Sequence, residues 1–332
     1  MKMQPIRLPR TGFSLVEMLI AIALMAIMTV SVTPQLRYLL DFQENSETRN
    51  NLDELLTGLS SAYQINVSSI ESDPQPEINF GTSGTMQASG AAQGTRCTAS
   101  ATNFMPWASY TGKSAATLYK DGFGAPLCVF VNPQASVQMD GFPVYYHVIA
   151  FVSTGANGVL DSGTVLDAAG NLSLGGDDMG VVFDGRTFAI ASYNTTTSKI
   201  QSLSKALQAY YLSRYQSDPT RSSSTDYWSN GNGSPDGSRW DASNPGNLIP
   251  YLTQATPMYT GSGTDISTAL GVSRNDVTDG YGNIVRFENA SQTVRSPVNQ
   301  VPDMAIPPYT AMISTNLPGN VLFTESVIGI NN

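Results

Sequence analysis

Histidine, cysteine and charged residues are scarce in this sequence, and each scarcity argues against a class of function. The 332 residues include one histidine, two cysteines and only 13% charged residues. A zinc site of Cys and His ligands, or a catalytic triad with a histidine base, is therefore disfavoured. The lone His147 lies in the apolar segment 144–149 and is interpreted as a strand residue. The formal net charge of −9 suits phosphate contacts poorly, because these need clustered Lys and Arg. We expect neither catalysis nor a nucleic-acid partner.

One long apolar run lies near the N-terminus. Residues 1–12 carry three bases and no acid, and only Glu17 is charged between Phe13 and Val32. Twenty residues at about 1.5 Å each span the roughly 30 Å hydrocarbon core of a bilayer. No small-x-small cleavage site follows before Pro34. The sequence therefore predicts a transmembrane helix over residues 13–33, with the basic flank in the cytoplasm and the rest of the chain outside.

The helix is predicted to continue beyond the membrane. From Leu36 to Tyr63, leucines and aromatic residues recur at steps of three and four, with charged residues between them. This pattern is typical of an amphipathic helix with one face on a protein core. We therefore expect one helix over residues 13–66, about 80 Å long. Residues 68–94, rich in Gly, Pro, Ser and Thr, are predicted to form a long surface loop.

The segment Gly12-Phe13-Ser14-Leu15-Val16-Glu17, between a short basic leader and an apolar helix, resembles the N-terminus of type IV pilins and pseudopilins. The resemblance implies that residues 1–12 are a leader. It also implies that a membrane prepilin peptidase cleaves between Gly12 and Phe13, and that the new amine of Phe13 is N-methylated. The resemblance itself covers about residues 7–63.

The same resemblance assigns roles to two residues of the helix. Glu17 would pair with the N-terminal amine of a neighbouring subunit, which neutralises a carboxylate that is costly inside a membrane. Pro34 would mark a weak point in the helix. The implied partners are the prepilin peptidase, other pilins or pseudopilins in a helical filament, and an inner-membrane assembly platform. The implied location is the bacterial inner membrane, with a single pass and the C-terminal part in the periplasm, and then a filament at the cell surface.

The two cysteines are Cys97 and Cys128. Outside the inner membrane an even pair is expected to be oxidised to a disulfide. A bridge across this separation stabilises by about 3 to 4 kcal/mol in the loop-entropy estimate. Two buried free thiols are the alternative.

The fold class predicted for the whole chain is α+β, with the long N-terminal helix packed on an antiparallel pilin-like sheet. Residues 67–186 are expected to form this first globular domain. Asp121-Gly122-Phe123-Gly124 indicates a turn that enters a strand at Cys128, and it is similar to a turn of major pseudopilins. Further strands are predicted over residues 145–153 and 181–183.

A glycine-rich acidic loop separates these last two strands. Calcium takes six to eight oxygen ligands, usually on a flexible loop, and this loop resembles the calcium loop of the major pseudopilin of type II secretion. By that resemblance Asp177 and Asp178 are candidate ligands, Ser153 is a candidate through its backbone carbonyl, and Asp161 is a further candidate. The sequence departs from the family in two respects, because Asn157 replaces an acid and the loop is longer. The alternative is that the acids form Asx turns that cap strands. No cofactor is required for the predicted function.

The order of features then repeats. A helical pattern over 198–212 is followed by Asp279-Gly280-Tyr281-Gly282 before an apolar strand, and then by a strand at 309–314 with a glycine turn. We interpret residues 187–332 as a second, degenerate pilin-like α+β domain without a membrane segment; chance similarity of glycine-rich turns is the alternative. No acid follows this second glycine turn until Glu325, so a calcium site is expected in the first copy only.

A polar loop in the second half contains Trp228 and Trp240 among Asn, Ser and Gly residues. Aromatic residues in such surroundings suit a carbohydrate or protein ligand. More often they fix a loop to its own domain.

The sequence as a whole predicts a structural subunit, a minor pilin or pseudopilin of a type IV pilus or a type II secretion filament. A major pilin is usually much smaller, which favours a minor position. The alternative is a pilus-tip adhesin whose C-terminal domain binds a surface or a carbohydrate. A membrane-anchored periplasmic enzyme is a third reading, and a DNA-uptake filament is not distinguished from the other two systems.

Overall fold

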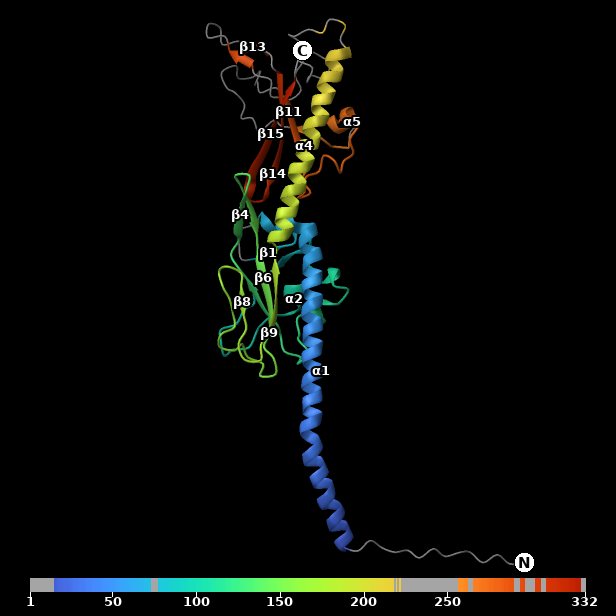
Figure 1. Cartoon of the computed structure of the whole chain (residues 1–332), viewed down its shortest axis with the longest axis vertical. Coiled ribbons are helices and arrows are strands. Elements are labelled where there is room, and N and C mark those ends of the chain that lie inside the picture. Colours follow the sequence, from blue (N-terminus) through green and yellow to red (C-terminus); the bar gives the residue numbers. More distant parts are fainter. Residues whose placement is uncertain are drawn as a thin grey trace, which may run out of the picture.

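Two long helices and two antiparallel sheets organise the chain, which is a mixed α+β protein (Figure 1). The computed structural model describes residues 15–72, 77–217, 219, 221, 256–261, 265–289, 293–295, 302–305 and 309–329. Within these ranges, the side chains at 27, 29–35, 256, 288–289, 293–295, 302–305 and 309–310 are not described. The long helices are α1 (Leu15–Glu71) and α4 (Arg186–Ser217). The short ones are α2 (Ala101–Phe104), α3 (Ala115–Leu118), α5 (Ile266–Leu270) and the 3-10 turns η1 (Gly81–Ser83), η2 (Ala108–Tyr110) and η4 (Pro318–Asn320).

Helix α1 is about 85 Å long at 1.5 Å per residue, and its two halves have different surroundings. The N-terminal half projects away from the rest of the molecule (Figure 1), whereas the C-terminal half lies against the first sheet. Leu52, Leu55, Leu59 and Tyr63 on the second half are fully buried or nearly so. Burial of this stripe explains why a helix with many polar residues stays helical at this end.

The helix ends later than predicted, at Glu71 rather than near residue 66. The last turns are buried through Val67, Ile70 and Glu71. Glu71 accepts hydrogen bonds from the side chains of Tyr63 and Gln134 and lies 2.9 Å from Nδ1 of His147. These tertiary contacts extend the helix, and the sequence pattern did not contain them.

The region after α1 was predicted to be a long surface loop, and this is wrong in part. It contains the short strands β1 (Ile78–Asn79) and β2 (Thr85–Met86), which pair with each other. Ile78, Phe80 and Met86 have no exposed surface. A few apolar side chains placed between glycines and serines were enough to draw this segment into the core.

The first sheet has the strand order β3-β6-β9 and is antiparallel throughout. Its strands are β3 (Cys128–Val131), β6 (Val148–Ser153) and β9 (Met179–Asp184), and β6 is buried along its whole length. The hairpins of this region are β4 (Ala135–Met139) with β5 (Phe142–Tyr146), and β7 (Val165–Leu166) with β8 (Leu172–Ser173). The strand predicted over 145–153 is thus divided at His147, which lies between β5 and β6.

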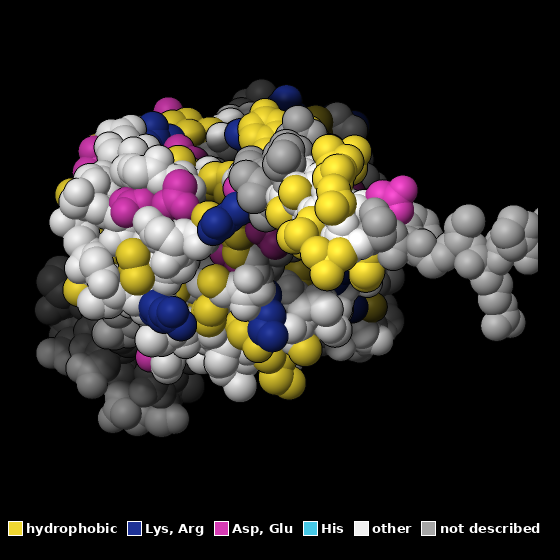
Figure 2. All heavy atoms as spheres, turned by 90° about the horizontal axis from the view of Figure 1, so that it is seen from below, with side chains coloured by type: hydrophobic (Ala, Val, Ile, Leu, Met, Phe, Trp, Pro, Cys, Tyr) yellow, Lys and Arg dark blue, Asp and Glu magenta, His cyan; other side chains and the backbone are white. Residues whose placement is uncertain are grey.

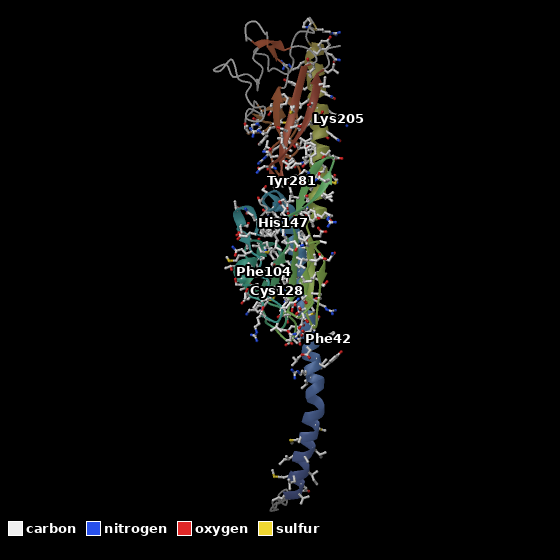
Figure 3. The ribbon with its side chains drawn as sticks, turned by 90° about the vertical axis from the view of Figure 1, so that its left-hand side faces the viewer. Phe42, Phe104, Cys128, His147, Lys205 and Tyr281 are labelled. Carbon is white, nitrogen blue, oxygen red and sulfur yellow. A yellow bond between two sulfur atoms is a disulfide. The ribbon has the colours of Figure 1, made fainter. Side chains whose placement is uncertain are left out.

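Helix α4 begins at Arg186, twelve residues before the predicted start, and extends beyond the C-terminal end of α1 (Figures 1 and 3). The added turns bury Ala189, Tyr193 and Thr196. A second antiparallel sheet packs on α4, in the order β10-β11-β14-β15. Its strands are β10 (Thr256–Pro257), β11 (Arg286–Asn289), β14 (Tyr309–Leu317) and β15 (Val321–Gly329), and a separate pair is formed by β12 (Thr293–Arg295) and β13 (Pro302–Ala305). We call residues 15–185 the first unit and residues 186–329 the second unit.

In the first unit, one turn ties the sheet to α1. The N–H of Gly122 donates to Oγ1 of Thr48 (2.9 Å), and this hydroxyl donates to the carbonyl of Glu44 one turn earlier (2.8 Å). The carboxylate of Asp121 accepts a hydrogen bond of 2.6 Å from the hydroxyl of Ser153 at the end of β6. Helix, turn and central strand are therefore joined by three hydrogen bonds.

The second unit repeats each of these contacts. Gly280 donates to Oγ1 of Thr196 (2.9 Å), and Thr196 donates to the carbonyl of Ser192 (2.9 Å). Asp279 accepts a hydrogen bond of 2.6 Å from the hydroxyl of Thr315 in β14. The buried stripes of the two helices follow their threonines at the same spacing: Leu52, Leu55, Leu59 and Tyr63 in α1, and Ile200, Leu203, Leu207 and Tyr211 in α4. The two units thus repeat one arrangement of helix, turn and strand.

The two units share one hydrophobic core. The buried cluster runs without a break from Leu52 on α1 to Val327 on β15. The rings of Phe142 and Phe323 lie 5.1 Å apart across the boundary. In Figure 3, His147 and Tyr281 mark the two sides of this contact. A cut near residue 186 would therefore expose apolar surface on both pieces.

Candidate functional site

The projecting half of α1 exposes apolar side chains on all sides, and Glu17 is its one acid in the first turn. Seen from below, hydrophobic side chains gather around this end of the helix (Figure 2). The exposed apolar residues are Leu15, Val16, Met18, Leu19, Ile20, Ile22, Leu24, Met25, Met28, Leu36, Tyr38, Leu39, Leu40 and Phe42. A negative charge at the first turn also complements the positive end of the helix dipole.

Other predicted features of this end are only partly visible. Gly12 and Phe13 lie outside the described residues. Pro34 lies inside α1, where it has no N–H to donate to the carbonyl four residues earlier. Within the ranges that the structure describes, no helix has the length and apolarity needed to cross a membrane. The predicted span over residues 13–33 includes positions whose placement or side chains are not described.

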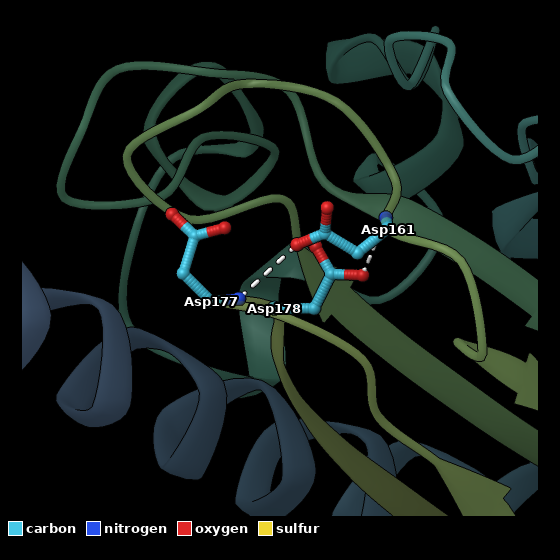
Figure 4. A group of neighbouring side chains, drawn as sticks. All are labelled: Asp161, Asp177 and Asp178. Atoms are coloured by element: carbon cyan, nitrogen blue, oxygen red, sulfur yellow. Dashed lines mark hydrogen bonds between the residues drawn. The ribbon is translucent and has the colours of Figure 1, made fainter.

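A second candidate site is the acidic loop, residues 154–178, which connects β6 to β9. One carboxylate oxygen from each of Asp161, Asp177 and Asp178 lies within 4.8 Å of the others (Figure 4). Asp178 is 7% exposed, while Asp177 is on the surface. Among the described residues this is the only cluster of its kind, and it lies in the first unit.

Hydrogen bonds hold the loop in this shape. The carboxylate of Asp161 accepts from the N–H of Asp177 (3.1 Å), and the N–H of Asp161 donates to Oδ2 of Asp178 (2.9 Å). Oδ2 of Asp177 accepts from the N–H groups of Ala156 (2.7 Å) and Asn157 (3.1 Å). These bonds join residues 16 to 21 positions apart, so they are long-range contacts across the loop and not the local bonds of Asx turns.

The cluster places three acidic side chains close together, and Asp178 is buried among them. Oδ1 of Asp178 is buried and has no hydrogen-bond partner among the described residues. Burial raises the pKa of Asp178, and the negative charges of Asp161 and Asp177 raise it further, against the lowering effect of hydrogen bonds from Thr164 and the Asp161 amide. Hydrogen bonds across the loop reach Oδ2 of Asp178 but leave its buried Oδ1 without a partner among the described residues.

Comparison with known proteins assigns the N-terminal segment. Residues 7–33 match the family described as the prokaryotic N-terminal methylation motif. This segment is a prepilin motif. Type IV pilins and pseudopilins carry it, and the resemblance noted from Gly12 to Glu17 is thereby confirmed. No curated protein and no solved structure gives a significant match to the chain.

The prepilin motif overlaps α1 over residues 15–33. The motif reaches residue 33, within the projecting half of α1, and the exposed apolar side chains continue from there to Phe42. Figure 3 shows Phe42 at the point where the helix leaves the globular part. The helix is thus divided into a half with exposed apolar side chains and a half that is buried in the fold.

The donor set of the acidic loop fits a hard cation in chemistry. Three carboxylates offer oxygen ligands, the kind that calcium takes, and the orphaned Oδ1 of Asp178 points into the cluster (Figure 4). Calcium bound there would be held by Asp161, Asp177 and Asp178 and would offset their like charges. The hydroxyl of Ser153 donates to Asp121, and the ligand role of its backbone carbonyl stays a prediction.

Sequence reasoning missed the residues that support the loop. Thr164 donates through its hydroxyl to Oδ2 of Asp178 and accepts from the N–H of Gly175 (2.8 Å). Asn157, noted only as a departure from the family, donates through Nδ2 to the carboxylate of Asp161 at 3.1 Å. Only the spacing of Asn157 from Asp161, four residues apart, hinted at this contact.

The remaining predicted residues have different outcomes. Cys97 and Cys128 form a disulfide with a Cα–Cα distance of 5.0 Å, and the structure describes no free cysteine. Trp228 and Trp240, suggested as ligand-binding residues, lie outside the described residues. His147 was interpreted as a strand residue; it lies instead in the break between β5 and β6, buried against Glu71.

Proposed function

We propose that this chain is a structural subunit of a type IV pilus or a type II secretion filament, assembled through α1. A prepilin peptidase would remove residues 1–12, and Phe13 would be methylated. The observation that carries the proposal is the prepilin motif over residues 7–33, followed by helical turns whose apolar side chains from Leu36 to Phe42 are exposed in the described part of the chain. Such a surface needs lipid or other helices to cover it.

The proposed route starts in the bacterial inner membrane. Before assembly, residues 13–33 would span the bilayer once and the two units would lie in the periplasm. Assembly would bring Glu17 next to the methylated amine of Phe13 in a neighbouring subunit, where opposite charges neutralise each other. The partners would be other pilins or pseudopilins and the assembly platform. No catalytic step is assigned to any residue.

A minor position in the filament follows from the two units. The second unit extends beyond the end of α1 in line with it (Figure 1). A filament built only from this chain would have to fit that extension between neighbours stacked along its axis. We therefore propose a low-copy subunit. The alternative of a pilus-tip adhesin stays a prediction, since Trp228 and Trp240 lie outside the described residues.

The N-terminus tests this function directly. Mass spectrometry of the protein from its host is expected to find a chain that begins at methylated Phe13, in membranes and in sheared filaments. The Glu17→Val variant should be cleaved and methylated but absent from the filament fraction, because its neighbour's amine has no carboxylate to meet. Glu47→Gln, an exposed glutamate on the same helix, serves as the matched control and should assemble normally. A chain that keeps Met1 would exclude the proposal.

We also propose calcium at the acidic loop as an accessory to the fold. At calcium a hundredfold above its dissociation constant, binding to the folded state alone stabilises by about 2.7 kcal/mol. The full-length protein in detergent is expected to show this as a rise in its unfolding temperature when calcium replaces EDTA. Asp178→Asn should remove most of the rise. Asp167→Asn, an exposed aspartate of the same loop, should keep it, and an equal loss in both variants would count against the site.

A further inference from the structure

The disulfide lies in a small cluster of its own, next to the acidic loop. Cys97 and Cys128 pack with Val152 of β6 and with Leu160, in a buried group separate from the main core. Leu160 is 1% exposed. Leu160 also immediately precedes Asp161. The hydrophobic group around the disulfide is therefore one peptide bond away from the first of the three acids.

Backbone hydrogen bonds connect the same segments. The N–H of Leu160 donates to the carbonyl of Thr95 (2.9 Å), and the N–H of Gly94 donates to the carbonyl of Leu160 (2.7 Å). Thr95 and Gly94 lie two and three residues before Cys97. Cys128 pairs with Val152 in the first sheet, so the bond between the two cysteines fixes segment 94–97 to that sheet.

The position of Asp161 depends on this connection. Its N–H donates to Asp178 and its carboxylate accepts from Asp177. A Cβ on Gly176 would lie 2.0 Å from Oδ2 of Asp161, so the loop segments around these two residues are in close contact. A shift of Leu160 away from the disulfide would therefore move the carboxylate of Asp161 out of the cluster.

Other attachments of segment 88–97 are few. The N–H of Ser89 donates to the carbonyl of Val129 in β3 (2.9 Å), and Gly90 lies against the ring of Phe130. These contacts hold residues 89–90 but not residues 94–97. The disulfide is the covalent link that keeps the second group of residues on the sheet.

We propose that the Cys97–Cys128 disulfide positions the acidic loop for cation binding, by holding Leu160 and through it Asp161. The part that concerns cations rests on the calcium site proposed above. The disulfide thus has a local role besides its effect on the unfolded chain. Elements that orient metal ligands without touching the metal typically change affinity by about ten- to a hundredfold.

The test compares the full-length wild type with the double variant C97S/C128S in detergent. Hydrogen exchange in EDTA should show loss of protection at the amides of Asp161 and Asp177 in the variant. Protection of β9 should be unchanged. In a calcium titration followed by thermal unfolding, the calcium concentration at the midpoint should be about tenfold higher for the variant than for the wild type. Leu203→Ala in α4 is the control, because it destabilises the second unit without touching the loop.

Each outcome of this test decides a separate question. Unchanged protection and an unchanged calcium midpoint in C97S/C128S would overturn the positioning role. A wild type that does not respond to calcium, together with a variant that loses protection, would refute the calcium site and leave the disulfide's hold on the loop established. If C97S/C128S does not fold, Leu160→Ala keeps the disulfide, removes the packing contact, and is judged by the same two measurements.

Discussion

The Glu71→Ala variant is expected to lose about 3 to 5 kcal/mol of unfolding free energy, because buried hydrogen-bond donors lose their acceptor and a cavity is added. Glu71 is the last residue of α1 and has no exposed surface. A carboxylate only accepts hydrogen bonds, so Tyr63, Gln134 and Nδ1 of His147 all donate to it. Alanine would leave two buried donors, Tyr63 and His147, without this acceptor and would add a cavity. Gln134 would keep its bond to the backbone carbonyl of residue 71 (2.8 Å).

The loss should also affect the contact between the units. Tyr63 packs against Phe183 and Phe188 with ring centroids 4.9 and 5.9 Å apart. Burial, and next the charge of Glu71, hold the pKa of Tyr63 well above its usual value, so its hydroxyl remains a donor. Gly185, just before α4, donates to the carbonyl of His147 (3.0 Å). The end of α1 and the start of α4 therefore meet at this cluster.

Glu54→Ala is the matched control. Glu54 lies on the same helix and pairs with Lys113, but the two side chains are 44% and 39% exposed. Exposed pairs contribute about 1 kcal/mol or less, so this variant should unfold almost as the wild type does. Chemical denaturation of the full-length protein in detergent measures both variants. Equal effects of the two substitutions would show that the buried cluster does not carry the stability assigned to it.

Two glycines of one turn should differ in their tolerance of alanine, and the order should be the same in both units. A Cβ on Gly122 would lie 2.2 Å from the carbonyl oxygen of Glu44, and a Cβ on Gly280 would lie 2.0 Å from that of Ser192. These oxygens belong to helix backbone and cannot move aside. Gly122→Ala and Gly280→Ala are each expected to lower the unfolding free energy by about 3 kcal/mol, the upper range for an overpacked site.

The second glycine of each turn supplies the control. Gly124 and Gly282 have φ values of +77° and +87°, with nothing within 4 Å of an added Cβ. Alanine there is strained only by its backbone, at about 1 to 2 kcal/mol. Denaturation of the four single variants measures the order. If Gly124→Ala were more destabilising than Gly122→Ala, or Gly282→Ala more than Gly280→Ala, the inference that the turn packs closely on the helix would be wrong.

Matching results in the two units would support an internal duplication. We propose that the second unit is a pilin-like copy that lost its membrane half, because α4 begins only six residues before Ser192, the equivalent of Glu44. The copy also lost the acidic loop. A short turn, η4, joins β14 to β15 where residues 154–178 join β6 to β9 in the first unit. The carboxylate cluster found among the described residues lies in the first unit, which is consistent with that difference.

Local chemistry explains what could be predicted from the sequence. The prepilin motif is a continuous string around Gly12 and Glu17, and it was recognised directly. Residues 36–63 have helical periodicity, and their side chains decide helix formation within a few turns. The turns at Asp121 and Asp279 use side-chain bonds to backbone atoms two and four residues ahead, so each is visible in a short window.

Only the tertiary structure decided how distant segments meet. A buried glutamate needs a partner, and the partner of Glu71 is His147, 76 residues away. No pattern in the sequence near Glu71 indicated this contact or the longer helix that makes it. Asp161 meets Asp177 and Asp178 through hydrogen bonds between residues 16 and 17 positions apart. The pairing of cysteines and the repeated turns could be anticipated from residue types alone. The shared core of the two units and the support of the acidic loop could not, because they depend on packing between segments that no local pattern relates.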